Sequence, residues 1–337
     1  MPSSPRQRLL AGLVLTLCCA GWAFSFPGMK ALTALGLRQV PGSSTVFLAF
    51  WCVGLRFLAS ALVLSPFVFL TGDLPSRREW QQGLGIGFFG GLGLVLQMDG
   101  ATYTHASTAA FLTQGYCLWI PIFVALRSRQ WPAPVVWTAC LLVLIGAGFL
   151  AGVRWNHFHL GRGELENLLG SVLFAGQILW LERPVFSGNH VLRFTWVMFL
   201  TMAALCIPWA MATAPSFGSL LTVYSTGPSL VILLFLIAIC TVANFLLMNR
   251  WQPQLSATEA GLIYCTEPVF TSGVSLFLPG WISSAFGLDY ANETLTWNLL
   301  LGGGLILGAN ALLQLFPPQR SDESSKIAGA LRDSMEG

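Results

Sequence analysis

The sequence predicts an all-α polytopic membrane protein with ten transmembrane helices, arranged as two inverted five-helix repeats. Three observations lead to this fold class. Only 9% of the 337 residues are charged and 55% are hydrophobic, so the chain cannot cover its surface with charge as a soluble domain does. Ten separate apolar stretches are long enough to cross a bilayer. Basic residues gather in alternate connections between those stretches.

The spans are read from apolar runs of about 20 residues, the length that crosses a bilayer as a helix. Turn-forming pairs such as Pro41-Gly42, Gly188-Asn189 and Pro279-Gly280 separate the runs. The first run is longer than a signal-peptide core and similar runs follow it, so we expect it to be retained as a helix. The predicted spans are 9–28, 45–70, 81–98, 106–126, 134–152, 164–182, 194–212, 228–249, 257–278 and 296–316.

The distribution of basic residues predicts the orientation. If the N-terminus is cytoplasmic, three Lys or Arg residues lie on the outer side (Arg38, Arg154 and Arg162), and Lys30 and Arg56 fall in spans. The other twelve of the 17 lie on the cytoplasmic side. This excess predicts a multi-pass protein of the inner (plasma) membrane with both termini in the cytoplasm. The twelve are Arg6, Arg8, Arg77, Arg78, Arg127, Arg129, Arg183, Arg193, Arg250, Arg320, Lys326 and Arg332.

Traces of an internal repeat accompany the ten spans. A unit of five spans has an odd number of crossings, so its copy must insert upside down. Leu55-Arg56-Phe57 is echoed by Leu192-Arg193-Phe194, and a Thr-x-Ala-x-Leu pattern at Thr108 recurs 150 residues later at Thr258. The predicted organisation is a cytoplasmic N-terminus (1–8), a first repeat (9–152), a second repeat (164–316) and a cytoplasmic tail (317–337).

Arg56 is the clearest candidate site residue. Charged side chains within a membrane are costly, so each is a functional candidate by default. Arg56 lies about halfway along the second span, too deep to reach either surface easily. It is expected to face the bundle interior, where an acidic side chain, backbone carbonyls and an anionic solute are all possible partners.

Glu267 is the second candidate. It precedes a proline near the middle of the ninth span, where a kink is expected. Tyr264, Glu267 and Thr271 fall on one helical face, and Gln114 begins the matching stripe of the fourth span. Two roles stay open for Glu267. It could neutralise Arg56 in an ion pair, which is the expected role, or take up a proton that is coupled to transport.

Trp22 and Gln177 complete the set of candidate substrate-binding residues, in the first and sixth spans. The partners expected from the sequence are a small-molecule substrate, the lipid bilayer and a coupled proton. The four histidines fall in connections without a triad-like arrangement, and no Gly-rich phosphate loop or metal-ligand cysteine spacing is present. We therefore expect no enzyme activity, no cofactor, no metal site and no nucleic-acid partner. No pattern in the sequence reports the oligomeric state.

Three motifs suggest a family. The segment from Gly21 to Lys30 in the first span, Leu55-Arg56-Phe57 in the second and Glu267-Pro268-Val269-Phe270 in the ninth occur in order along the chain. Together they resemble EamA-type transporters of the drug/metabolite transporter superfamily. The resemblance covers nearly the whole chain. It implies ten helices in two inverted halves and the export of amino acids or other metabolites, and it makes Arg56 and Glu267 family positions.

The chain also departs from that family. Cys117 stands where the family often has proline, and a long connection from Pro279 to Glu293 follows the ninth span, where it is expected to cover part of a cavity mouth. The predicted function is a secondary transporter, an exporter or exchanger, that moves a small metabolite such as an amino acid by alternating access. The alternatives are an importer of a small solute and a membrane-embedded receptor or enzyme.

Overall fold

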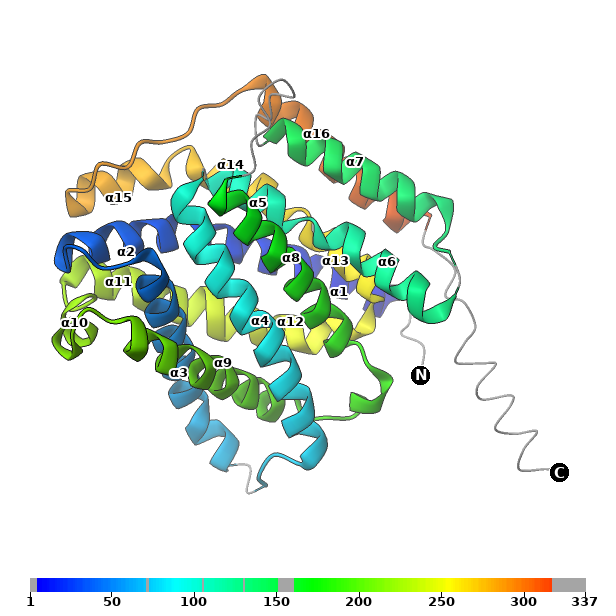
Figure 1. Ribbon diagram of the computed structural model, residues 1–337. Helices are drawn as coiled ribbons and strands as arrows, with labels where there is room; N and C mark the ends of the chain where they lie inside the picture. Colours follow the sequence, from blue (N-terminus) through cyan, green and yellow to red (C-terminus); the bar gives the residue numbers. More distant parts are fainter. Residues whose placement is uncertain (1–4, 71–72, 105, 130, 151–160, 317–337) are drawn as a thin grey trace.

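The computed structural model describes residues 5–70, 73–104, 106–129, 131–150 and 161–316. Every regular element within these residues is a helix, which confirms the all-α class (Figure 1). Six of the described helices are long and apolar enough to cross a membrane, and one bent helix pair would make seven. The chain is therefore a multi-pass membrane protein. The predicted tail and the end of the fifth predicted span lie outside the described residues.

The first half of the chain begins with a longer helix than the sequence predicts. α1 and α2 continue past the expected end of the first span, up to the turn at Pro41-Gly42. Gly42 has φ 82°, a left-handed conformation that glycine adopts without strain and that often ends a helix. The helices are α1 (Pro5–Ala23), α2 (Ser25–Gln39), α3 (Thr45–Leu70), α4 (Arg77–Tyr103), α5 (Ala106–Thr113), α6 (Tyr116–Ser128) and α7 (Pro134–Leu150).

The second half contains a π-helical stretch, η3, in the middle of the predicted eighth span. Short 3-10 turns, η2 (Pro184–Phe186) and η4 (Gln252–Gln254), follow α8 and α12. The other elements are α8 (Arg162–Leu181), α9 (Val191–Thr213), α10 (Phe217–Thr222), α11 (Gly227–Phe235), η3 (Leu236–Ala243), α12 (Asn244–Trp251), α13 (Ala257–Tyr264), α14 (Glu267–Ser275), α15 (Leu278–Phe286) and α16 (Trp297–Leu315).

The predicted fourth and ninth spans are each broken in the middle, into α5 and α6 and into α13 and α14. In the ninth span the cause is Pro268, which has no N–H to donate to the carbonyl of Tyr264. The Sγ of Cys19 lies 3.8 Å from that carbonyl oxygen. The kink expected at Glu267-Pro268 thus takes the form of a two-residue turn, at Cys265 and Thr266, between α13 and α14.

A cysteine thiol also compensates for the proline within α6. Pro121 cannot donate to the carbonyl of Cys117, one turn earlier. Cys140 of α7 donates its thiol to this oxygen at 3.2 Å. Because a backbone carbonyl in an apolar interior is costly when it has no partner, this thiol stabilises α6 and fixes α7 against it.

The helices pack closely through small residues. α3 packs on α9, α4 packs on both α8 and α9, and α7 packs on α16. A Cβ atom on Gly87 would lie 2.8 Å from the carbonyl oxygen of Met198, and one on Gly146 would lie 2.7 Å from that of Gly302. Because glycine has no Cβ, the two helix backbones can approach each other closely at these positions, which is how helices associate in lipid.

The connection after the ninth predicted span contains a helix that the sequence analysis does not foresee. The span was expected to end at 278 in a loop, but α14 ends at Ser275 and α15 follows, at an angle of 48° to the preceding pair. The backbone N–H of Glu293 donates to the Ser275 carbonyl at 2.8 Å, and the Ser283 hydroxyl donates to the Tyr290 carbonyl at 2.6 Å. These bonds tie the connection back onto α14 and α15.

Candidate functional site

A central cavity lies where helices of the two halves meet. The centre of a water molecule can occupy about 80 Å³ of it, which is room for several waters or a small solute. The walls come from α1 to α6 in the first half and from α8 and α12 to α14 in the second. The lining residues are Trp22, Ser25, Phe26, Arg56, Leu94, Gln97, Thr113, Tyr116, Phe174, Gln177, Ile178, Phe245, Met248, Tyr264 and Glu267.

Arg56 lies in the cavity wall and is 1% exposed. Its Nε donates to the Thr241 hydroxyl, its Nη1 to the Ser25 hydroxyl at 3.3 Å and its Nη2 to the Cys240 carbonyl at 3.0 Å. Thr241 and Cys240 belong to η3, and π-helical turns of this kind recur at functional sites. All three acceptors are uncharged. Hydrogen bonds to neutral groups therefore hold this guanidinium in place.

The expected ion pair between Arg56 and Glu267 is wrong. The guanidinium is bound to α2 and η3, which supply enough acceptors to replace a carboxylate. Glu267 belongs to a different part of the wall, at the start of α14. Within the described parts of the chain, the ion pairs are Arg8 with Glu259, Arg162 with Asp99, Arg162 with Glu166, and Arg193 with Asp73.

Glu267 is the first residue of α14 and is 9% exposed. Its side chain lines the cavity, and no group in the described residues donates a hydrogen bond to its carboxylate. Pro268 has no N–H, and the backbone N–H groups of Val269 and Phe270 donate to the Thr266 carbonyl at 3.1 Å and 3.3 Å. The broken helix thus places an acidic group at the cavity, at the end of a half-helix.

Aromatic rings form much of the remaining wall. Trp22 packs edge-on against Phe245 and Tyr264, with ring centroids 5.5 Å and 5.8 Å away. The polar atoms of two of these rings bond to the protein. Trp22 Nε1 donates to the Cys240 carbonyl at 2.9 Å, and the Tyr264 hydroxyl donates to Gln252 Oε1 at 2.9 Å. The rings therefore give the cavity a mainly apolar surface.

Two of the predicted binding residues lie outside the cavity lining. Gln114 lies in the turn between α5 and α6, where its side chain accepts from the Tyr116 hydroxyl at 2.9 Å and donates to the Ala110 carbonyl at 3.1 Å. Thr271 is buried, and its hydroxyl has no hydrogen-bond partner in the described residues. The breaks before α6 and α14 interrupt the helical period on which both assignments rest. The predicted residues that do line the cavity are Trp22, Arg56, Gln177, Tyr264 and Glu267.

Other residues of the site are not among those predicted from the sequence. Gln97 lines the cavity and donates to the Thr113 hydroxyl at 3.3 Å. It lies inside the predicted third span, so the rule that selects buried polar residues in a membrane would have found it. Ser25 and Thr241, which hold Arg56, carry no comparable signal because hydroxyl side chains are common in membrane helices and often bond to their own backbone.

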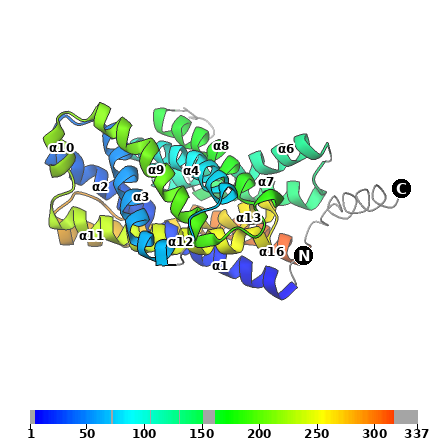
Figure 2. The same cartoon turned by 90° about the horizontal axis from the view of Figure 1, so that it is seen from below.

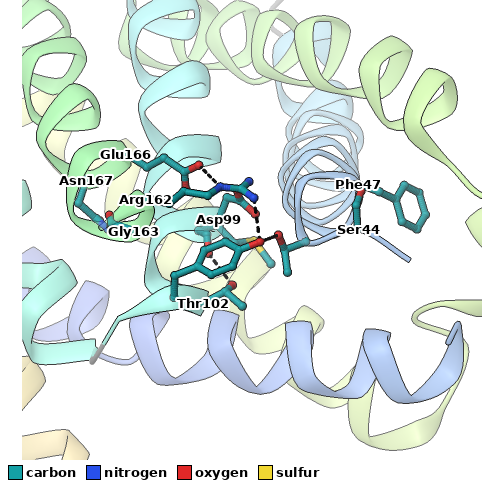
Figure 3. A network of polar contacts seen from close by, with 11 residues as sticks. Ser44, Phe47, Asp99, Thr102, Arg162, Gly163, Glu166 and Asn167 are labelled. Carbon is teal, nitrogen blue, oxygen red and sulfur yellow. Dashed lines mark hydrogen bonds and ion pairs between the residues drawn. The ribbon is translucent and has the colours of Figure 1, made fainter. Parts of the chain in front are cut away.

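A separate polar network fastens three helices at one end of the molecule (Figure 3). Arg162, at the start of α8, pairs with Asp99 of α4 and with Glu166 one turn later in α8. It also donates to the Tyr103 hydroxyl at 2.9 Å, which is hydrogen-bonded to Thr45 of α3 at 2.7 Å. The hydrogen bond to Glu166 raises the pKa of the Arg162 guanidinium above its ordinary value. The arginine therefore stays charged.

The opposite end of α8 is fixed by different contacts. The carboxylate of Glu182 accepts a hydrogen bond from the backbone N–H of Ala257 at 2.6 Å, which joins the end of α8 to the start of α13. Ser256 and Glu259 form a capping box at this start, and Glu259 also pairs with Arg8 of α1. Polar contacts thus join the helices around the cavity at both ends.

Known proteins share both sequence and fold with this chain. Residues 9–152 match the EamA-like transporter family. An uncharacterized transporter of Archaeoglobus fulgidus is 26% identical over 264 residues, which cover 78% of this chain and 76% of that protein. An uncharacterized transporter of Synechocystis sp. is 27% identical over 196 residues, or 56% of each protein. A solved crystal structure has a similar fold, with a TM-score of 0.63 and 17% identity over 94% of this chain and 100% of that one.

Proposed function

We propose that this chain, an EamA-type member of the drug/metabolite transporter superfamily, is a secondary transporter that moves a small metabolite such as an amino acid by alternating access. The observation that carries the proposal is the central cavity. Both halves of the chain contribute to its wall, and the wall contains a basic and an acidic side chain, Arg56 in the middle of α3 and Glu267 at the break between α13 and α14. Buried charges between helix bundles are typical of solute pathways.

Ten spans in two inverted repeats are part of this proposal, and the arrangement of the broken helices supports them. Thr113 and Tyr264 each end a half-helix and lie 151 residues apart, and so do Tyr116 and Glu267, which begin the following half-helices. α3 packs on α9 and α7 packs on α16. These are the second and the fifth spans of the two proposed repeats, and equivalent helices meet in this way when a pseudo-two-fold axis runs between the repeats. The family match at 9–152 has the same limits as the proposed first repeat.

We also propose that the protein lies in the inner membrane with both termini in the cytoplasm. The start of α1 and the end of α16 are at the same end of the molecule (Figure 2). The excess of basic residues in alternate connections supports a cytoplasmic location for that end. We prefer export or exchange as the mode of transport, and import is the alternative within the class of secondary transporters.

The test is transport by purified protein in liposomes. A panel of labelled amino acids and other small metabolites is supplied with and without a pH gradient across the membrane. We expect the flux of at least one compound to exceed that of protein-free liposomes, and a dependence on the gradient would identify a coupled proton. If no compound in a broad panel crosses faster than in protein-free liposomes, the transporter proposal fails, and a membrane receptor or enzyme becomes the better alternative.

A further inference from the structure

We infer that the substrate presents a protonated amine to the carboxylate of Glu267 and lays an apolar body against the aromatic wall of the cavity. This inference rests on the proposed transport function and narrows the class of its substrate. A polar group that already has a partner in the protein gains little from a ligand, whereas an unsatisfied buried group gains much. Whether a polar group of the cavity already has a partner in the protein therefore indicates which groups a solute must supply.

Most polar groups of the wall are engaged within the protein. Arg56 donates to two hydroxyl groups and to a backbone carbonyl. An incoming carboxylate would have to compete with these acceptors for the guanidinium. The polar atoms of four other lining side chains also have partners, namely those of Trp22, Thr113, Tyr116 and Tyr264.

Two lining side chains have no hydrogen-bond or ion-pair partner within the described residues, and these are Glu267 and Gln177. More than nine-tenths of the Glu267 surface is buried, and what stays accessible faces the cavity. An ionised carboxylate in an apolar interior is unfavourable until a cation pairs with it. An ammonium group supplies that positive charge together with three N–H donors. The amide of Gln177 is available to a second polar substituent.

The rest of the cavity favours the same class of solute. The rings of Trp22, Phe174 and Phe245 line it, and aromatic faces attract ammonium groups as well as apolar bodies. A solute that carries only a carboxylate would meet the like charge of Glu267. The geometry therefore favours an amine with a small apolar body over an organic anion of the same size.

The experiment compares three probes that share one ring and differ in charge. Purified protein in lipid nanodiscs is titrated at pH 7 with benzylamine, benzyl alcohol and phenylacetate, and binding is measured by calorimetry. We expect benzylamine to bind at least about ten-fold more tightly than the other two. Equal affinity for the three probes would overturn the inference, as would tighter binding of phenylacetate.

Variants identify the carboxylate that is responsible. Glu267→Gln keeps the size of the side chain and removes its charge, and it should weaken benzylamine binding by about ten-fold or more while leaving benzyl alcohol unaffected. Glu164→Gln is the matched control because Glu164 lies in the first turn of α8, outside the cavity lining. Benzylamine affinity that is unchanged in Glu267→Gln contradicts the assignment. If that variant does not keep its melting temperature, Glu267→Asp replaces it; because aspartate keeps the charge, it should still bind benzylamine more tightly than benzyl alcohol, and loss of that preference would contradict the assignment.

The flux assay separates this inference from the proposed function. Flux of other solutes without any preference for amines would overturn the inference and leave the transporter standing. Benzylamine binding that depends on Glu267, without flux of any solute, would support the site and count against transport.

Discussion

Trp22 and Arg56 donate hydrogen bonds to the same acceptor, the carbonyl oxygen of Cys240. Trp22 Nε1 lies 2.9 Å from it and Arg56 Nη2 lies 3.0 Å from it. A carbonyl oxygen has two lone pairs and can accept both bonds. Three segments that are distant in sequence, α1, α3 and η3, therefore meet at one atom in the cavity wall. A change at either donor is expected to affect the position of the other.

Trp22→Phe tests this shared acceptor. The substitution keeps an aromatic ring and removes the N–H, so we expect the free energy of unfolding to fall by about 1 kcal/mol and the transport rate to fall as Arg56 shifts. Thermal unfolding in detergent and flux in liposomes measure the two effects. Trp131→Phe is the control because Trp131 is 84% exposed. Equal behaviour of the two variants would contradict a structural role for the Trp22 N–H.

Arg56→Lys and Arg56→Ala test the guanidinium itself. Lysine keeps the charge, but its ammonium group cannot reproduce the planar fork that serves Ser25, Thr241 and the Cys240 carbonyl. We expect both variants to reduce flux by about ten-fold or more, with Arg56→Ala also the less stable because it removes the hydrogen bonds to two buried hydroxyl groups and one of the two to the Cys240 carbonyl. If both variants fold and transport like the parent protein, Arg56 is not a site residue.

Asp99→Asn tests the network at the start of α8. It removes the charge from the buried side of the pair with Arg162, and we expect a loss of roughly 1–3 kcal/mol in the free energy of unfolding. Asp73→Asn is the matched control, since the Asp73 side chain is 75% exposed in its pair with Arg193 and such pairs contribute little. The readout is the melting temperature of each variant in the same detergent. A loss as large in Asp73→Asn would contradict the importance of burial.

Gly146→Ala and Gly148→Ala test how closely α7 approaches α16. A Cβ at 146 would lie 2.7 Å from the Gly302 carbonyl oxygen, whereas a Cβ at 148 would meet no atom of the described residues within 4 Å. We expect Gly146→Ala to destabilise the fold by about 1–3 kcal/mol because the helices must separate. Gly148→Ala should be neutral or slightly stabilising, since alanine favours a helix more than glycine does. Melting temperatures in one detergent compare the two, and a similar fall in both would show that helix propensity and not contact decides the result.

The sequence predicts where the charges of the site lie better than it predicts their partners. The depth of Arg56 and Glu267 follows from the apolar residues around them, because hydropathy reports distance from the ends of a span. Two of the three acceptors of Arg56 lie in η3, more than 180 positions away along the chain. Hydropathy carries no information about such contacts, and the simplest electrostatic expectation, an ion pair with Glu267, was wrong for that reason.

Helix breaks can be predicted from the sequence where their cause lies in the same helix, and not where it lies elsewhere in the fold. The interruption at Glu267 could be predicted because the effect of Pro268 on its own helix is local. The break before Tyr116 coincides with Gly115 and has no proline beside it, so the span 106–126 reads as a single helix in the sequence. At α15 the sequence predicts a loop, because Pro279 and Gly280 form a turn signal. Proline is also well tolerated in the first turn of a helix, which is its position here.

The thiol of Cys140 has a practical consequence for spectroscopy. Motion in transporters is usually followed with probes attached to single engineered cysteines, in a background from which the native thiols have been removed. At Cys140 the thiol is the donor to a carbonyl that Pro121 leaves without its helical partner. Serine, which restores a donor, is therefore the replacement to use there, whereas alanine would leave that oxygen unsatisfied within the apolar interior. A background built with alanine at this position would report on a distorted α6.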